Sequence, residues 1–320
     1  MTEIWTMGEL LAEIMRPERD LPLDQAGPFL GPFPSGAPGI FIDTVARLGH
    51  SGGIVSAVGD DAFGTAILER LRRDGVRTDL VTVVPRRSTG VAFVAYAGDG
   101  SRTFIFHWEG TPAVMAGVPP RTVVQGSSYF HVMGCSMMAD HAFRERLIET
   151  VELFAADGVD ITFDPNIRME LVGARQVDAI VAPILRHCSI LFPGASELQI
   201  LGGTTDLDRA ATTMMRRHPL QMIVVKLGRA GCRVYTGDRR IDVPAFDVLE
   251  VDPTGAGDCF DAGFLCGLLD GEPPEHAART AAAVGALNAG AFGPMEGDIS
   301  RASVAALRGS QAGSPDRAHT

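Results

Sequence analysis

The sequence predicts an α/β protein whose mostly parallel sheet is covered by helices and accompanied by a small β-lid. Short apolar runs that end in turn residues, such as GIVSAVGD, ITFDPN, SILFP and MIVVKLG, are typical of buried strands. Amphipathic segments alternate with these runs, among them FGTAILERLRRDGV, HAFRERLIETVELFAADG and DLDRAATTMMRRH. Strands and helices that alternate in this way indicate a parallel sheet with helices on its faces.

Two stretches interrupt the alternation and predict the lid. Residues 14–36 are too rich in proline and glycine to form a long helix. Residues 88–108 alternate apolar and polar side chains around Gly98-Asp99-Gly100, as the strands of a β-hairpin do. We therefore expect a lid formed by residues from about 12–36 and 86–110.

Composition and charge narrow the classes of partner. The chain has 320 residues, a net charge of −11 and a pI of about 5.2. It therefore lacks the excess of Lys and Arg that is typical of nucleic-acid-binding proteins. No apolar run reaches the roughly 18 residues of a membrane span. The acidic N-terminus does not resemble a signal peptide, and the five cysteines fit buried thiols in a reducing cytoplasm. We expect one cytoplasmic domain over residues 1–310, followed by a disordered tail at 311–320.

The stretch DPTGAGDCFDAG, at residues 252–263, carries the clearest chemical signal. It follows the strand-like VPAFDVLEV and precedes an apolar, helical run. Glycines at a helix N-terminus let unpaired N–H groups surround an anion, so Gly255, Ala256 and Gly257 form a candidate anion hole. Asp258 would repel a bound phosphate, but it could accept a proton from an attacking hydroxyl. An ordinary N-cap aspartate on a glycine-rich turn is the alternative interpretation.

Six motifs, in order along the chain, resemble those of the ribokinase-type, or phosphofructokinase-B, carbohydrate kinases. They are PSGAPGIFIDTVARLG, SAVGDDAFG, DPNIR, VVKLGRAG, TGAGDCFDAGF and ALNAGAFGPMEG. The resemblance extends from about residue 4 to 300. It implies a ribokinase-like three-layer α/β/α sandwich with a mostly parallel sheet and a β-lid.

The resemblance also implies transfer of the γ-phosphoryl group of ATP to a hydroxyl, usually a primary alcohol of a sugar. Asp258 is then the catalytic base, and the N–H groups of Gly255, Ala256, Gly257 and Asp258 stabilise charge on the moving phosphoryl group. Arg168, in DPNIR, is the candidate to clamp phosphoryl or substrate oxygens.

The same resemblance suggests residues for the nucleotide and for metal ions. Glu197 is expected to orient Mg2+-bound water, although Gly194 replaces the asparagine usual three residues earlier. Asp252 matches a position that in many members helps to hold a monovalent cation such as K+, with Thr254 beside it, while Asp261 is expected to serve the turn and this cation site. The candidate nucleotide-site residues are Lys226, Gly228, Gly231, Asn288 and Thr254.

The segment PSGAPGIFIDTVARLG, which the resemblance assigns to the sugar site, departs from the family pattern. Ile40 stands where relatives carry an asparagine that binds sugar hydroxyls, and isoleucine cannot do so. Asp43 lies three residues further, so in a helix opened by Pro38 it could share that face and take over the contact. The candidate substrate residues are Glu13, Gly36, Asp43, Trp108 and Asn166.

The motifs look most like those of fructokinase- or tagatose-kinase-like members, which act on neutral sugars. A 2-keto-3-deoxygluconate kinase is the alternative. Those kinases tend to carry an arginine that meets the substrate carboxylate, but here Trp108 stands near that position and Glu109 would repel a carboxylate. A non-catalytic protein on the same fold is a third alternative, because the asparagines expected at positions 40 and 194 are missing. Exposed lid strands also suggest a homodimer formed through the lid.

Overall fold

The computed structural model describes residues 3–98, 101–138, 140–167, 177–237 and 239–310. Its main sheet has nine strands in the order β13-β12-β11-β10-β9-β8-β1-β4-β5. The strands from β11 to β5 pair in parallel, whereas β12 and β13 add an antiparallel edge. Their bounds are β1 Ile4–Met7, β4 Gly52–Gly59, β5 Val81–Val84, β8 Tyr129–Met133, β9 Asp160–Asp164, β10 Cys188–Leu191, β11 Met222–Lys226, β12 Cys232–Thr236 and β13 Arg239–Val243.

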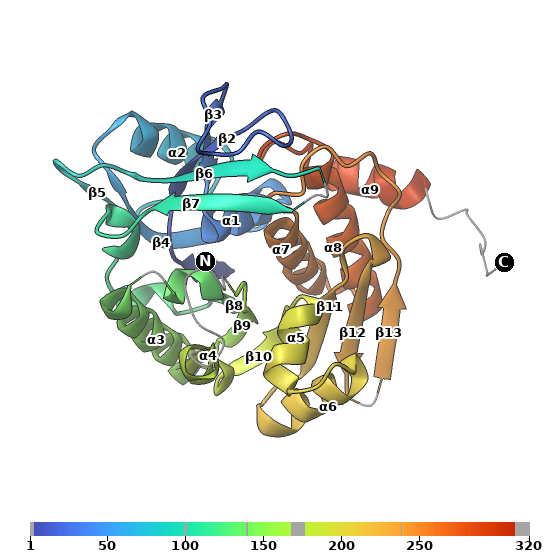
Figure 1. Cartoon of the computed structure of the whole chain (residues 1–320). Helices are drawn as coiled ribbons and strands as arrows, with labels where there is room; N and C mark the ends of the chain where they lie inside the picture. Colours follow the sequence, from blue (N-terminus) through green and yellow to red (C-terminus); the bar gives the residue numbers. More distant parts are fainter. Residues whose placement is uncertain (1–2, 99–100, 139, 168–176, 238, 311–320) are drawn as a thin grey trace.

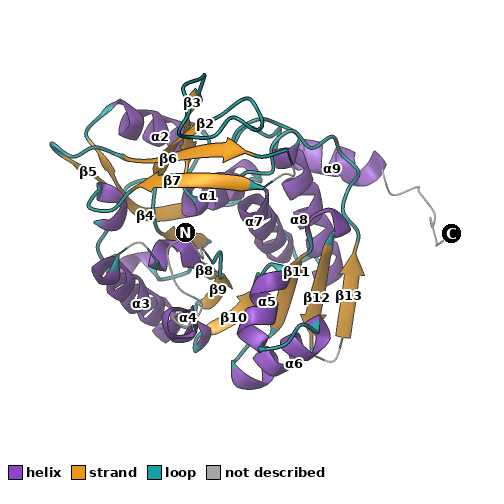
Figure 2. Cartoon of the chain, in the orientation of Figure 1, coloured by secondary structure: helices purple, strands orange, loops and turns teal. Residues whose placement is uncertain are grey.

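Helices cover both faces of this sheet, as the alternating sequence pattern predicts (Figures 1 and 2). Successive strand residues point to opposite faces, so that in β11 Ile223 and Val225 join one core cluster and Val224 joins the other. One face carries α1 Ala37–Arg47, α2 Ala62–Arg73, α7 Ala256–Leu269, α8 Pro274–Ala289 and α9 Arg301–Ser310; the other carries α3 His141–Ala156, α4 Val177–Leu185, α5 Ala195–Gly202 and α6 Leu207–Arg217. Short 3-10 turns occupy Pro112–Val114, Arg121–Val123, Gly134–Met137 and Gly228–Ala230. The predicted α/β/α sandwich is confirmed.

A second sheet forms the lid, in the order β3-β2-β6-β7. Its strands are β2 Leu11–Met15, β3 Leu30–Ser35, β6 Gly90–Tyr96 and β7 Arg102–His107. The expected hairpin is the β6–β7 pair, while β2 joins β6 in parallel. Leu11, Ala92, Trp108 and Ala113 bury a small apolar cluster on this sheet. The lid is thus stabilised by its own packing as well as by the body.

One expectation about a strand is wrong, whereas the expectation about the cysteines is confirmed. The strand-like VPAFDVLEV is not a strand, since β13 ends at Val243 and residues 244–250 form an irregular segment that reaches α7. All five cysteines are buried thiols, as expected. Among the described residues, no helix combines the length and apolar character needed to cross a membrane.

Candidate active site

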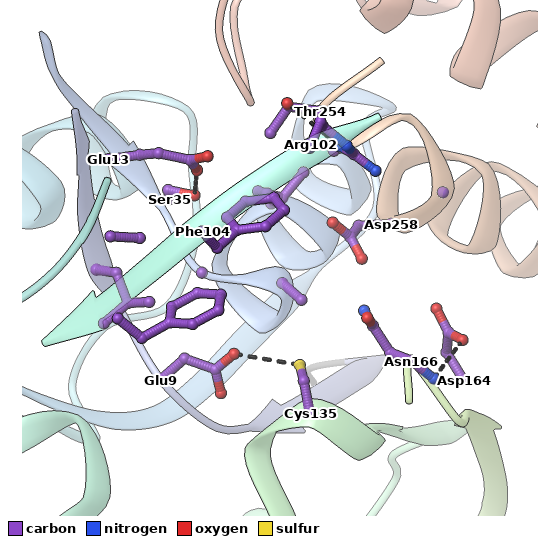
Figure 3. Close-up of a pocket in the computed structure, with 18 of the residues that line it drawn as sticks. Glu9, Glu13, Ser35, Arg102, Phe104, Cys135, Asp164, Asn166, Thr254 and Asp258 are labelled. Atoms are coloured by element: carbon purple, nitrogen blue, oxygen red, sulfur yellow. Dashed lines mark hydrogen bonds between the residues drawn. The ribbon is translucent and has the colours of Figure 1, made fainter. Parts of the chain in front are cut away.

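A cavity of about 220 Å3 lies where the lid meets the carboxyl ends of β9 and β11 and the start of α7 (Figure 3). Ligands of open α/β sheets gather at such strand ends. The lining comes from the lid, the β1–β2 segment, the start of α1, the 3-10 turn Gly134–Met137, the strand ends, the start of α5 and the turn before α7. Its polar residues include Glu9, Glu13, Ser35, Arg102, Asp164, Asn166, Glu197, Lys226, Thr254 and Asp258.

The turn before α7 has the geometry of an anion-binding site. Gly255 is left-handed, with φ 76°, and a Cβ there would lie 2.4 Å from the carbonyl oxygen of Pro294. Only glycine fits, because the left-handed conformation and the close approach both exclude a side chain. Asp258 stands in the first turn of α7, nearly buried, and its carboxylate points into the cavity (Figure 3). Of the predicted anion-hole residues, Gly255, Gly257 and Asp258 line this cavity, whereas the Ala256 N–H donates to the Pro253 carbonyl oxygen at 3.2 Å.

A second cavity of about 460 Å3 lies on the other side of this turn. Its lining includes the expected Lys226, Gly228 and Gly231, and also Ala256. Sequence reasoning missed its apolar wall, which is formed by Phe246, Val248, Phe260, Ala282 and Ala286. Nothing in the alanine-rich sequence of α8 indicates that a cavity touches Ala282 and Ala286, which are half-buried. Lys226, Pro253 and Gly257 line both cavities, which therefore meet at the start of α7.

Lys226 is held at this junction by two carboxylates. Its Nζ donates to Asp164 Oδ2 at 2.6 Å and to Asp261 Oδ2 at 3.1 Å. A Cβ on Gly257 would lie 3.8 Å from Nζ, so the ammonium group lies beside the candidate anion hole. Although burial disfavours the charged form, Asp164, Asp261 and Glu197 raise the pKa of Lys226, which stays a cation.

Asp261 has a different place from the one expected. It is fully buried and binds Lys226, whereas the sequence assigned it to the turn and the cation site. Burial raises the pKa of Asp261 well above its usual range. His131 Nε2 lies 4.0 Å from Asp261 Oδ2, and burial lowers the pKa of this histidine to about 3, which keeps it neutral. No pattern in the sequence links Asp164, Lys226 and Asp261.

Asn288 does not reach the nucleotide cavity, contrary to expectation. It is fully buried in α8, and its Nδ2 donates to the carbonyl oxygen of Thr254 at 2.8 Å. Asn288 therefore stabilises the backbone of the turn before α7. Thr254 itself lines the first cavity rather than the second.

Asp252 is buried in the same turn and accepts three hydrogen bonds. Its Oδ1 accepts from Tyr96 Oη at 2.9 Å and from the Thr254 N–H at 3.0 Å, and its Oδ2 accepts from the Gly293 N–H at 3.0 Å. A carboxylate can accept about four hydrogen bonds, so a share in a monovalent cation site is compatible with these contacts. That role of Asp252 stays a prediction.

Asp43 is not a cavity residue, so the proposed replacement for the missing asparagine is wrong. Ile40 lines the cavity, but Asp43 is buried 3.5 Å from Arg70 of α2 and 3.8 Å from Arg47. Residues three apart are turned about 60° from each other on a helix, and this rotation is enough to direct Asp43 to α2. Burial raises the pKa of Asp43 to about 7.

The other candidate substrate residues do line the first cavity. Glu13 accepts a hydrogen bond from Ser35, and Gly36, Trp108 and Asn166 complete this side. Sequence reasoning missed Glu9, which also lines the cavity and accepts from Cys135 Sγ at 3.3 Å. The sequence signal for Glu9 is its place directly after the buried strand β1, since ligands gather at the carboxyl ends of parallel strands.

Glu197 lies at the start of α5 and lines the cavity floor. Its two oxygens accept from the N–H groups of Gly194 and Ile167, each at 2.7 Å. Burial raises the pKa of Glu197. In the described part of the chain no cluster of three or more His, Cys, Asp or Glu forms a ready metal site. Arg168 lies outside the described residues.

Comparison with known proteins agrees with this geometry. The profile of the "pfkB family carbohydrate kinase" matches residues 34–300. The chain belongs to the pfkB family of carbohydrate kinases. As a member it is a sugar kinase, a phosphotransferase with an alcohol group as acceptor.

This pfkB kinase is 30% identical over 270 residues to "Probable fructokinase-2" of Arabidopsis thaliana, covering 83% of this chain and 81% of that one. It is 29% identical over 294 residues to "Fructokinase-1" of Oryza sativa, covering 89% and 90% of the two chains. A solved "putative Ribokinase II" from E. coli in complex with ATP and Mg2+ matches with a TM-score of 0.90 and 34% identity, over 97% of this chain and all of that one.

Proposed function

We propose that this kinase transfers the γ-phosphoryl group of ATP to a hydroxyl, a primary alcohol, of a neutral sugar of the fructose or tagatose type. The observation that carries the proposal is the meeting of two cavities at the first turn of α7, with Asp258 facing one of them and Lys226 lining both. The fructokinases among its relatives and the ATP complex of the E. coli neighbour support it.

The chemistry of each group follows from its place. Sugar binds under the lid, and ATP binds against the apolar wall of the second cavity. Asp258 takes the proton of the attacking hydroxyl. The N–H groups of Gly255, Gly257 and Asp258 are the donors for the moving phosphoryl group, since that of Ala256 donates to the Pro253 carbonyl oxygen at 3.2 Å. Lys226 adds a positive charge beside them. Lid closure excludes water and so limits hydrolysis of ATP.

The donor set at the junction fits Mg2+, which prefers carboxylate oxygen and water. Asp164 and Glu197 both line the first cavity close to Lys226, and carboxylates outnumber cations there. These two residues would hold the ion through water. Mg2+ neutralises charge on the β- and γ-phosphates of ATP when bound. A K+ ion near Asp252 is part of the same proposal.

A neutral sugar is favoured over an acid sugar because Glu9 and Glu13 both face the cavity. Glu109 does not contribute to this repulsion, since it is exposed and outside the lining. The acid-sugar alternative rests on Arg102, a lid cation that lines the cavity beside Thr254 (Figure 3).

The test is ADP release with ATP and Mg2+ against fructose, tagatose, ribose, 2-keto-3-deoxygluconate, a nucleoside and no sugar. Turnover on a neutral ketose that disappears in Asp258→Asn would support the proposal. Turnover on the acid sugar alone would refute the substrate class and favour the role of Arg102. No turnover with any acceptor would favour a binding protein on the same fold.

A further inference from the structure

The lid and the turn before α7 are joined by direct hydrogen bonds. Tyr96 ends β6 and Arg102 begins β7, and the two residues are opposite partners in the hairpin. Tyr96 Oη lies 3.1 Å from Thr254 Oγ1, and Arg102 Nη1 donates to the same oxygen at 3.4 Å. Tyr96 Oη also donates to Asp252 Oδ1 at 2.9 Å. One end of the lid hairpin is therefore fastened to the segment that precedes the anion hole.

The fastened segment sets the direction of the α7 N–H groups. Asp252 Oδ1 accepts the Thr254 N–H at 3.0 Å, so the carboxylate that binds Tyr96 also shapes the turn. Asn288 holds the Thr254 carbonyl from the opposite side. Gly255 comes next, in the left-handed conformation, and α7 begins at Ala256. A shift of Asp252 or Thr254 would thus be passed directly to the anion-hole N–H groups.

Tyr96 acts through these neighbours rather than on a ligand. Neither described cavity has Tyr96 in its lining, although Arg102 and Thr254 line the first. The Tyr96 hydroxyl is the donor in its bond to Asp252, because the carboxylate can only accept. A second lid contact supports the same region, because the Tyr96 and Phe33 rings both lie against Phe292, at centroid distances of 6.4 and 6.0 Å.

We propose that Tyr96 is a positioning residue that couples lid closure to the anion hole: it holds Asp252 and Thr254 so that the N–H groups of Gly255, Gly257 and Asp258 are aimed at the transferring phosphoryl group. This inference rests on the proposed function. It adds that the anion hole is fully formed only when the lid lies over the sugar.

The test uses the full-length Tyr96→Phe variant, which keeps the ring and removes only the hydroxyl. Tyr235→Phe is the matched control, because Tyr235 Oη makes the same kind of bond, to Asp208 Oδ1 at 2.6 Å, between β12 and α6. Amide hydrogen exchange is measured on peptides covering residues 252–262, and steady-state kinetics on the sugar that gives turnover.

Tyr96→Phe is expected to speed exchange in residues 252–262 roughly tenfold, the change expected when a hydrogen bond to a charged group is lost. It should lower kcat roughly tenfold while the KM for sugar changes little, because the anion hole acts mainly in the transition state. Tyr235→Phe should change neither quantity. Combining Tyr96→Phe with Thr254→Val should cost less than the sum of the two single changes.

Unchanged exchange in residues 252–262 would overturn the proposal, as would faster exchange confined to the lid strands. A rise in the KM for sugar with kcat unchanged would also overturn it, because Tyr96 would then serve sugar binding alone. If the wild-type chain phosphorylates no sugar, the proposed function fails, while the exchange measurement still decides whether Tyr96 holds the turn.

Discussion

Replacing Lys226 with methionine should destabilise the protein in a pH-dependent way. The variant keeps the length of the side chain but leaves Asp164 and Asp261 without their shared cation. Both carboxylates are nearly inaccessible, with side-chain exposures of 4% and 0%, whereas Lys226 is 18% exposed. Removal of one partner from a buried ion pair costs about 3–5 kcal/mol, and the partial exposure of Lys226 places the loss near the lower value, about 3 kcal/mol.

The pH dependence follows from the direction of the pKa shifts. Burial already raises the pKa of Asp261, and loss of the Lys226 charge raises it further. A carboxyl with a raised folded pKa favours the folded state when protonated, so its contribution is complete below the unfolded pKa and is lost as pH rises through the folded pKa. The deficit of Lys226→Met relative to wild type should therefore be larger at pH 8 than at pH 5.

The assay is urea unfolding at pH 5, 6.5 and 8, with the double variant Lys226→Met/Asp261→Asn as the control. The neutral amide removes one stranded charge, so the double variant should recover part of the loss at pH 8 and depend less on pH. Equal stability of the single and double variants at pH 8, or a deficit that does not change with pH, would refute the buried-charge reasoning.

Three further changes test other parts of the structure. Asp258→Asn should lower kcat by roughly 10²–10⁴ through loss of the general base, while calorimetry still detects sugar and ATP binding; near-normal kcat would remove Asp258 from the mechanism. Gly255→Ala should lower the free energy of unfolding by about 1–3 kcal/mol because of the left-handed φ and the close Pro294 oxygen, and a stability equal to wild type would contradict that strain. Ile105→Glu, on the exposed face of the lid at 44% exposure, should convert a lid-mediated homodimer into monomers by sedimentation, whereas Phe104→Leu beside it should not; a monomeric wild type would exclude the dimer.

The sequence predicts the fold well because local patterns determine it. Apolar runs of strand length alternate with amphipathic segments, and this alternation alone implies parallel strands with helices on both faces. The lid was predictable for the same reason, from the prolines of residues 14–36 and the period of residues 88–108. The glycines and Asp258 were predictable because a strained turn at a helix N-terminus requires particular residue types.

The errors share a physical cause, which is that neighbours in space are not visible in the sequence. Asp43 and Asn288 are polar residues near the site, but a rotation of about 60° on α1 directs Asp43 to Arg70, and Asn288 binds the back of the turn. Asp261 shares a motif with Asp258 but points to Lys226 at the end of β11. Each of these contacts depends on the packing of distant elements.

The charge distribution in the first cavity gives the strongest argument about substrate class. Glu9, between β1 and β2, and Glu13, in β2, form the wall away from α7, while Arg102 lies beside Thr254 near Asp258 (Figure 3). Lys226 is already bound by Asp164 and Asp261. A sugar carboxylate could meet Arg102 only by lying near the phosphoryl-transfer site, where Asp258 and the γ-phosphate would repel it. Hydroxyl groups can donate to Glu9 and Glu13 without that cost, so the cavity fits a neutral polyol better than an acid sugar.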